Sequence, residues 1–366
     1  MHDVIVIGGG AIGLSIAREV AARGGTVLVL DRGMAGEPSS WAAAGMLAPQ
    51  SEAEHPDPLF HLCVASLHMY RAWADHLREQ TGIDPEYADP GLLFLAATEH
   101  ALEALKSRLA WQRSAGFSAE LLAPEDLYRL EPGITLPVVG AALMPGEHHI
   151  TPRRLLKALR SACTARGVEI RSGIRVQELM VAQNRVEGVR AGNETISGRT
   201  VIVSSGAWSG EIAGLRPRLP VSPRKGQILS LSMPGAAFRR MIRWENAYFV
   251  PRRDGELVVG ATNEDAGFDR NLTPSAVGRL LTQAQQISSH TGAYPIIEMW
   301  TGLRPATPDG LPVIGRGSIE GLIYATGHYR NGILLAPVTA SIVASLVENQ
   351  MPAIPLEPFA PSRFEV

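Results

Sequence analysis

The first part of the chain combines short apolar runs with a helical pattern. Val4 to Ile7 and Thr26 to Leu30 are apolar runs of strand length, and Ile12 to Ala22 places small and apolar residues on one helical face. This order predicts a strand, a helix and a second strand, which is the usual opening of a parallel sheet. A loop rich in Ser, Ala and Gly follows from Pro38 to Gln50, and a helical pattern then covers Pro58 to Glu79.

The middle of the chain predicts more strands than helices. Helical patterns cover Glu99 to Ala115, Thr151 to Arg166 and Ser275 to Ser289. The strand-like runs are Gly91 to Ala97, Val168 to Arg171, Arg185 to Ala191, Thr200 to Ser204, Arg239 to Trp244, Ala247 to Pro251 and Leu257 to Gly260. Short polar turns separate the last of these runs, which predicts antiparallel pairing between them.

The end of the chain returns to the pattern of its beginning. Leu322 to Thr326 is strand-like, and Gly332 to Val347 is an apolar helical stretch. This stretch is shorter than the ~20 residues that cross a bilayer, and Pro337 interrupts it, so we expect a buried helix.

These patterns predict an α/β fold, or α+β when the whole chain is considered. Parallel-sheet material at both ends would form a Rossmann-like domain, and the antiparallel strands between them would form an inserted substrate domain. We expect the Rossmann-like domain to comprise residues 1–90, 145–215 and 300–366, and the substrate domain residues 91–144 and 216–299.

Composition narrows the kind of ligand and the compartment. The 366 residues are 45% hydrophobic, and 34 Lys and Arg against 36 Asp and Glu give a net charge of −2. This balance supplies no field that would gather nucleic acid or an anionic membrane, so we expect a small molecule as the ligand. Cys63 and Cys163 are the only cysteines, and the N-terminus lacks the pattern of a signal peptide. A reducing cytoplasm is therefore expected.

Three glycines stand between the first predicted strand and the first predicted helix. The spacing of Gly8, Gly10 and Gly13 allows a tight turn, close approach of the backbone to a pyrophosphate, and tight packing of helix on strand. Asp31, at the end of the second predicted strand, is placed to accept hydrogen bonds from ribose hydroxyls. These features predict a bound dinucleotide, but they do not distinguish NAD from FAD.

Four segments carry a resemblance to a known family. Ser39 to Pro49 resembles the flavin-contacting loop of the glycine oxidases, which belong to the D-amino-acid oxidase superfamily of FAD-dependent oxidoreductases. Thr200 to Gly210, Trp300 to Pro305 and Gly327 to Gly332 are similar to the family's second flavin-side glycine turn, its substrate-arginine motif and the turn beside the flavin pyrimidine. These segments follow the order of the family along nearly the whole chain.

The resemblance implies that the Rossmann-like domain binds FAD. The expected cofactor residues are Gly8, Gly10, Ala11, Ile12, Gly13, Asp31, Arg32, Ser39, Ser40, Ala44, Gly45, Met46, Val176, Gly206, His328, Tyr329, Arg330, Asn331, Gly332, Ile333 and Leu334. Related sarcosine oxidases attach flavin through a cysteine near the last of these turns, whereas this chain has no cysteine beyond Cys163. Noncovalent FAD is expected, and the dipole of a helix starting near Gly332 would favour negative charge on the reduced flavin.

The resemblance also implies the residues that meet the substrate. Arg304 is expected to bind a substrate carboxylate, because a guanidinium grips both carboxylate oxygens in one plane. Tyr248 matches a tyrosine that lies over the substrate, and Arg330 matches a position near it. Two positions depart from the family. Asp31 stands where a glutamate is common, and Asn246 precedes Tyr248 in a variable segment.

The implied reaction is the oxidation of glycine or a small amine to an imine, which hydrolyses to glyoxylate and ammonia while dioxygen becomes hydrogen peroxide. A role in thiamine thiazole biosynthesis and a homodimer or homotetramer are implied too. Oxidation of sarcosine, small D-amino acids or a bulkier N-carboxymethyl amine stays open, as does transfer of electrons to another acceptor. A tRNA-modifying module and a non-catalytic flavin protein are less favoured.

A metal centre is not expected. Glu147, His148 and His149 are consecutive, but neighbouring histidines in a strand point to opposite faces, and no further ligand motif accompanies them.

Overall fold

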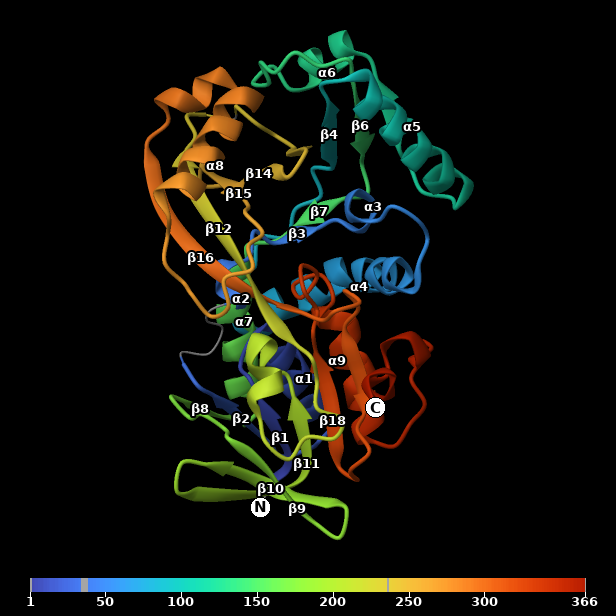
Figure 1. Cartoon of the computed structure of the whole chain (residues 1–366), viewed down its shortest axis with the longest axis vertical. Helices are drawn as coiled ribbons and strands as arrows, with labels where there is room; N and C mark the ends of the chain where they lie inside the picture. The colour runs from blue at the N-terminus through green and yellow to red at the C-terminus, as the bar shows by residue number, and fades with distance from the viewer. Residues whose placement is uncertain (1, 34–38, 236, 366) are drawn as a thin grey trace.

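The computed structural model describes residues 2–33, 39–235 and 237–365. Figure 1 shows two sheets at opposite ends of the long axis, with helices beside each. The long strands β12 (Ser222–Ser232) and β16 (Ile296–Ala306) run from the second sheet towards the first. The predicted combination of a parallel-sheet part and an antiparallel-sheet part is therefore confirmed. Pro38, the first residue of the predicted Ser- and Gly-rich loop, lies outside the described residues.

The first sheet contains the strands predicted at the two ends of the chain. Its main path runs β17-β18-β11-β1-β2-β8, and β10 and β9 continue from β11. All neighbours on the main path are parallel except β17, which is antiparallel to β18. The bounds are β1 (His2–Ile7), β2 (Val27–Asp31), β8 (Glu169–Ser172), β9 (Glu178–Ala182), β10 (Arg185–Ala191), β11 (Glu194–Val203), β17 (Val313–Arg316) and β18 (Leu322–Thr326).

Alternate residues of β1 and β2 pack on opposite faces of this sheet, because successive side chains of a strand point in opposite directions. Val4 and Val6 join the core beneath the helices, whereas Ile5 and Ile7 join the core beneath β9 and β10. Both faces are covered, which explains why these strands are apolar at every position. The helical layer consists of α1 (Ala11–Ala22), α4 (Pro58–Thr81), α7 (Pro152–Ala165) and α9 (Ala336–Val347).

The second sheet is mainly antiparallel and has the order β16-β12-β15-β14-β13-β4-β6-β5. Its remaining strands are β4 (Leu92–Ala96), β5 (Glu120–Leu122), β6 (Gly140–Met144), β13 (Met241–Trp244), β14 (Ala247–Pro251) and β15 (Glu256–Gly260). The helices α5 (Glu99–Ser114), α6 (Pro124–Leu130) and α8 (Pro274–Ile287) pack against it. The strands come from the two stretches predicted to form the substrate domain and from β16, whereas the exact domain boundaries stay a prediction.

The remaining described elements are short. They are α2 (Ser39–Ala42), β3 (Met46–Leu47), α3 (Pro49–Glu52), β7 (His148–His149) and the 3-10 helices η1 (Gly206–Glu211), η2 (Ser289–Ala293), η3 (Glu357–Phe359) and η4 (Pro361–Phe364). The strands β3 and β7 pair with each other between the sheets (Figure 1). Within the described residues, no helix is long and apolar enough to cross a membrane.

The last helix starts later than its sequence pattern suggests. We expected it to begin near Gly332, but α9 begins at Ala336, and a turn occupies the preceding residues. Pro337 explains the difference, since a proline inside a helix would clash with the carbonyl four residues earlier, whereas the first helical turn accepts it. The expected helix dipole at Gly332 is therefore corrected to a turn that leads into α9.

Buried hydroxyl groups on α4 hold that turn. Tyr70 is fully buried, and its hydroxyl donates to the carbonyl of Ile333 at 2.7 Å. The Ser66 hydroxyl donates to the carbonyl of Leu334 at 2.6 Å. Two carbonyls of the four-residue turn before α9 thus have donors from α4, as buried backbone groups require.

Replacing Tyr70 with Phe should lower the free energy of unfolding by about 1–2 kcal/mol, because the buried Ile333 carbonyl loses its donor. Urea unfolding checks this. Tyr294→Phe, at a partly buried tyrosine packed beside α8, serves as the control and should change stability much less. Equal effects of the two substitutions would contradict the assignment.

The histidine at the end of β7 makes stability depend on pH. Burial lowers the pKa of His149 to about 3, and the positive charge of Arg252 acts in the same direction. Arg252 Nη1 lies 3.2 Å from His149 Nδ1, so the neutral ring can accept its hydrogen bond. An unfolded histidine titrates near pH 6.5. The folded state therefore binds fewer protons between about pH 3 and 6.5, and stability falls as the pH decreases through that window.

His149→Asn keeps an acceptor beside Arg252 and removes the titrating group. Between pH 6.5 and 4.5, the variant should lose stability less steeply than the parent, by roughly 1 kcal/mol per pH unit. Urea unfolding across this range measures both slopes, with the exposed His290→Asn as a control. Identical slopes in the parent and His149→Asn would refute the prediction.

Candidate active site

A cavity of about 680 Å³ opens where the carboxyl ends of β1, β2, β11 and β18 converge. It continues past the loop that contains α2 to residues of β12, β14 and β16. Ligands of open parallel sheets bind at the carboxyl ends of strands, where the strand order reverses. The cavity therefore joins the expected dinucleotide site to the second sheet.

The glycine turn after β1 has no space for side chains. Gly8 has a φ of +108°, and a Cβ on Gly13 would lie 1.9 Å from the Gly8 carbonyl oxygen. Gly10 precedes α1, whose first backbone N–H, at Ala11, donates to the Ser40 hydroxyl at 3.0 Å. The turn thus forms a narrow cradle at a helix N-terminus, which fits the pyrophosphate of a dinucleotide.

Asp31 and Arg32 lie beside this cradle. The Asp31 carboxylate accepts hydrogen bonds from the backbone N–H of Gly9 at 2.5 Å and of Gly33 at 2.9 Å. The Arg32 guanidinium lies over the ring of Trp208, 4.3 Å from its centroid. Trp208 belongs to η1 and lines the cavity, but we did not predict it, although it stands within the segment that resembled the second flavin-side turn.

The loop that contains α2 is fastened to β16. Its Ser39 hydroxyl donates to the carbonyl of Leu303, and the indole N–H of Trp300 donates to the carbonyl of Ala42 at 3.0 Å. Both partners on β16 lie within a few residues of Arg304. The expected flavin-contacting loop is therefore joined directly to the strand that carries the expected substrate arginine.

Arg252 holds the other side of the same loop. Its guanidinium is buried and donates to the carbonyls of Ala44 and Ile150. Burial lowers the pKa of Arg252 to about 10, so it remains a cation at neutral pH. We did not predict this residue. The only signal was an arginine directly after an apolar strand, which commonly marks a surface.

The turn after β18 is also attached to β16. Tyr329 has a φ of +46°, and its backbone N–H donates to the carbonyl of Pro305 at 2.9 Å. His328 is buried, and its Nε2 lies 3.1 Å from the Thr339 hydroxyl of α9. Burial lowers the pKa of His328 to about 3, which keeps the ring neutral. The two segments expected to contact the flavin ring thus meet at one end of β16.

Arg304 and Tyr248 lie over glycines of neighbouring strands. A Cβ on Gly226 would lie 2.5 Å from both terminal nitrogens of Arg304, and a Cβ on Gly260 would lie 2.4 Å from the Tyr248 hydroxyl. Burial raises the pKa of Tyr248, whereas the nearby charge of Arg304 opposes the rise. The phenol therefore keeps its proton at neutral pH and can donate a hydrogen bond.

Arg330 has an acidic partner. Its Nη1 lies 3.5 Å from Glu52, which also pairs with Arg243 at 2.7 Å, and all three side chains line the cavity. Burial opposes the charge of Arg330, but the carboxylate of Glu52 raises its pKa overall. Glu52 and Arg243 were not predicted, because they come from elements that meet only in the folded chain.

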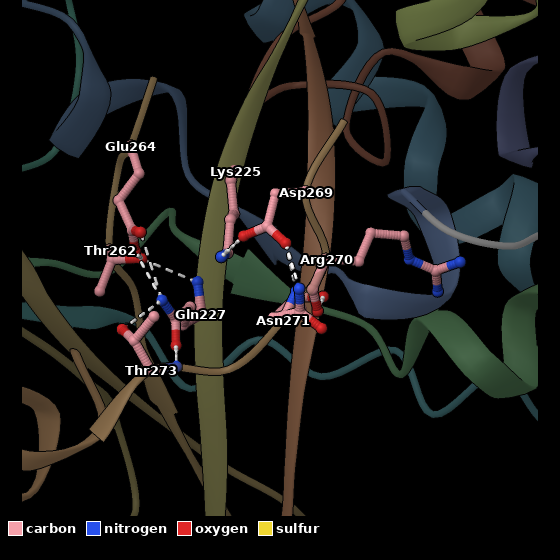
Figure 2. A network of polar contacts seen from close by, with 9 residues as sticks. Lys225, Gln227, Thr262, Glu264, Asp269, Arg270, Asn271 and Thr273 are labelled. Atoms are coloured by element: carbon pink, nitrogen blue, oxygen red, sulfur yellow. Dashed lines mark hydrogen bonds and ion pairs between the residues drawn. The ribbon is translucent and has the colours of Figure 1, made fainter. Parts of the chain in front are cut away.

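A polar network of Thr262, Gln227 and Glu264 (Figure 2) is joined to the Arg304 guanidinium by a hydrogen bond. Arg304 Nη1 donates to the carbonyl of Thr262 at 3.0 Å, and Thr262 in turn contacts Gln227 and Glu264. Thr262 and Glu264 line the cavity. None of these three residues was predicted, since nothing in their local pattern marks them.

The structure brings nearly all of the predicted site residues to one cavity. Those lining it are Gly8, Gly10, Ala11, Ile12, Asp31, Arg32, Ser39, Ser40, Ala44, Gly45, Met46, Val176, Gly206, Tyr248, Arg304, His328, Tyr329, Arg330, Asn331, Gly332 and Ile333. Gly13 instead packs behind the glycine turn, and Leu334 is buried against α4. The individual roles of these residues stay predictions.

Comparisons with known proteins agree with this architecture. A family model described as "FAD dependent oxidoreductase" matches residues 3–346. The glycine oxidase of Geobacillus kaustophilus is 34% identical over 367 residues, which cover 99% of this chain and 97% of that protein. A crystal structure of glycine oxidase from Geobacillus kaustophilus superposes with a TM-score of 0.95 at 33% identity, covering 98% of both chains.

A longer relative matches as well. The "Bifunctional protein ThiO/ThiG" of Trichormus variabilis is 38% identical over 369 residues, which cover all of this chain and 55% of that protein. The chain thus spans about half the length of the curated ThiO/ThiG relatives it matches. The resemblance on which the sequence prediction rested is confirmed, and the chain belongs to the family of FAD-dependent oxidoreductases.

Proposed function

We propose that the chain is an FAD-dependent oxidase of glycine or a closely similar small amine. The observation that carries this proposal is the position of Arg304, whose guanidinium lines the cavity on the strand to which both expected flavin-contacting segments are attached. A carboxylate bound by Arg304 would therefore hold its amino acid at a defined place relative to the flavin ring.

The residues around the cavity suit noncovalent FAD. The glycine cradle and the N-terminus of α1 can receive the pyrophosphate, and Asp31 and Arg32 lie where the adenosine half would begin. The segments from Ala44 to Met46 and from His328 to Ile333 would line the flavin ring. When bound, FAD supplies the acceptor of two electrons and passes them to dioxygen, which becomes hydrogen peroxide.

Arg304 and Tyr248 would bind and orient the substrate. The guanidinium can pair with both oxygens of the carboxylate, and the protonated Tyr248 hydroxyl can donate a further hydrogen bond. Glycine loses two electrons and two protons to become the imine, and water converts the imine to glyoxylate and ammonia. If the amino group of glycine is uncharged when it is oxidised, no dedicated base is needed. The cavity carboxylates Glu52 and Glu264 already have partners, in Arg243 and Gln227.

The similar proteins also support a proposal for the metabolic role of the chain. Glycine oxidases similar over the full chain, together with ThiO/ThiG proteins, support a supply of the glycine-derived imine to thiamine thiazole biosynthesis. A homo-oligomer in the cytoplasm, with dioxygen as the electron acceptor, completes the proposal.

Arg304→Ala should raise the apparent KM for glycine by about 100-fold or more, because a carboxylate in the cavity loses its charged partner. Peroxide release under air measures the KM, and the visible flavin spectrum should remain that of bound FAD. Arg224→Ala, on the opposite strand and paired with Asp265 at 2.9 Å, is the matched control. An unchanged KM in Arg304→Ala would remove this residue from the substrate site.

Gly226→Ala should also weaken glycine binding, by about 10-fold or more, since its Cβ would occupy the space of the Arg304 guanidinium. The control is Gly278→Ala in α8, where a Cβ meets nothing within 4 Å. Steady-state kinetics and flavin absorbance of both variants separate substrate binding from loss of FAD. Normal glycine kinetics in Gly226→Ala would show that Arg304 does not need its position over this glycine.

A further inference from the structure

We infer that Thr262 is a positioning residue for Arg304, and that Gln227 and Glu264 hold Thr262 in place. The inference rests on the proposed role of Arg304 in binding a substrate carboxylate. It concerns the segment from 262 to 273, which follows β15 and contacts β12, as Figure 2 shows for Thr262, Glu264 and Asp269.

The carbonyl of Thr262 orients the guanidinium. It accepts a hydrogen bond from Arg304 Nη1 at 3.0 Å, and across the described residues it is the only hydrogen-bond partner that the structure shows for this side chain. Gly226 leaves one face of the guanidinium without a side chain beneath it. The position of the Thr262 carbonyl therefore determines the direction in which the remaining N–H groups of Arg304 point.

The hydroxyl of Thr262 ties that carbonyl to β12. It accepts a hydrogen bond from the backbone N–H of Gln227 at 2.8 Å and donates to the carboxylate of Glu264. The backbone N–H of Thr262 donates to the Gln227 carbonyl at 3.2 Å. Three hydrogen bonds thus hold two atoms of Thr262, its hydroxyl oxygen and its backbone nitrogen, through groups other than Arg304.

The side chain of Gln227 completes the support. It is fully buried, and its Nε2 donates to both oxygens of Glu264, at 3.0 and 3.2 Å, and to the Thr273 hydroxyl at 3.1 Å. Its Oε1 accepts from the backbone N–H of Thr273 at 2.9 Å. Every polar atom of this amide has a partner, and such satisfied buried networks are rigid.

The network also keeps the Glu264 carboxylate from pairing with Arg304. Glu264 lines the cavity, and a mobile carboxylate there could pair with Arg304 in competition with the substrate. Gln227 and Thr262 instead occupy its oxygens. Arg304 then keeps its other N–H groups for the carboxylate of an incoming amino acid.

Two further contacts anchor the far end of the 262–273 segment. The buried Lys225 ammonium pairs with Asp269 at 2.6 Å, and the Thr301 hydroxyl donates to the carbonyl of Arg270 at 2.9 Å. These anchors come from β12 and β16, the strand pair that carries Gly226 and Arg304. The 262–273 segment and Arg304 are therefore held by the same pair of strands, β12 and β16.

Thr262→Val tests the inference, because valine keeps the shape of threonine and lacks its hydroxyl. Loss of the hydroxyl leaves the Gln227 N–H without its partner and frees the Thr262 carbonyl to move. In FAD-loaded protein, we expect the Kd for acetate, a carboxylate without an amine, to rise about 10-fold. The KM for glycine should rise in parallel, with little change in kcat at saturation.

Thr262→Ser should restore acetate binding to within about 2-fold of the parent, because the hydroxyl returns. Thr291→Val is the control, since it removes the hydroxyl of another buried threonine, one that bonds to Ser288 away from the cavity. Acetate is titrated while the flavin absorbance is followed, and the flavin spectrum without acetate reports whether the fold and the FAD site are intact.

The outcomes distinguish this inference from the proposed function. If Arg304→Ala weakens acetate binding but Thr262→Val does not, the positioning role is overturned and the proposed function stands. If Thr262→Ser is as weak as Thr262→Val, the hydroxyl is not the cause and the inference also fails. If Arg304→Ala binds acetate normally, both fall. Weak binding in Thr262→Val that Thr262→Ser restores, with Thr291→Val unchanged, supports the inference.

Discussion

The candidate site depends on the attachment of two separate backbone segments to one end of β16. The loop that contains α2 is fixed through Ser39 and Ala42, and the turn after β18 is fixed through the Tyr329 N–H and the Pro305 carbonyl. Each segment belongs to the part of the chain that would hold the flavin, whereas β16 belongs to the second sheet. In the proposed function, a few hydrogen bonds at this junction would therefore set the relative position of cofactor and substrate.

Glycines on the adjacent strands leave space for the two side chains that we propose to bind the substrate. Arg304 lies over Gly226, and Tyr248 lies over Gly260, so both side chains lie flat against a strand. Gly226 gives the Arg304 guanidinium space but does not fix its orientation. In our inference, the network of Thr262, Gln227 and Glu264 fixes that orientation. Support of this kind is what holds a binding group within the narrow tolerances that catalysis requires.

Local patterns predicted much of this structure, and long-range contacts account for what they missed. The opening strand, helix and strand, the glycine turn and 21 of the cavity-lining residues follow from periodicity and from segments that resemble a family. Arg252 and Gln227 could not be found in this way, because their partners lie in loop segments that approach them only in the folded chain. The late start of α9 shows a local rule, the effect of Pro337, overriding an apolar pattern.

The central claim is that a carboxylate held by Arg304 places the substrate for oxidation. Anaerobic mixing of the FAD-loaded protein with glycine, and separately with methylamine and with glycine methyl ester, tests it most directly, because only glycine carries a free carboxylate. The account predicts rapid bleaching of the flavin absorbance by glycine and bleaching slower by orders of magnitude with the other two amines. Equal rates for all three, or no bleaching by glycine, would contradict it.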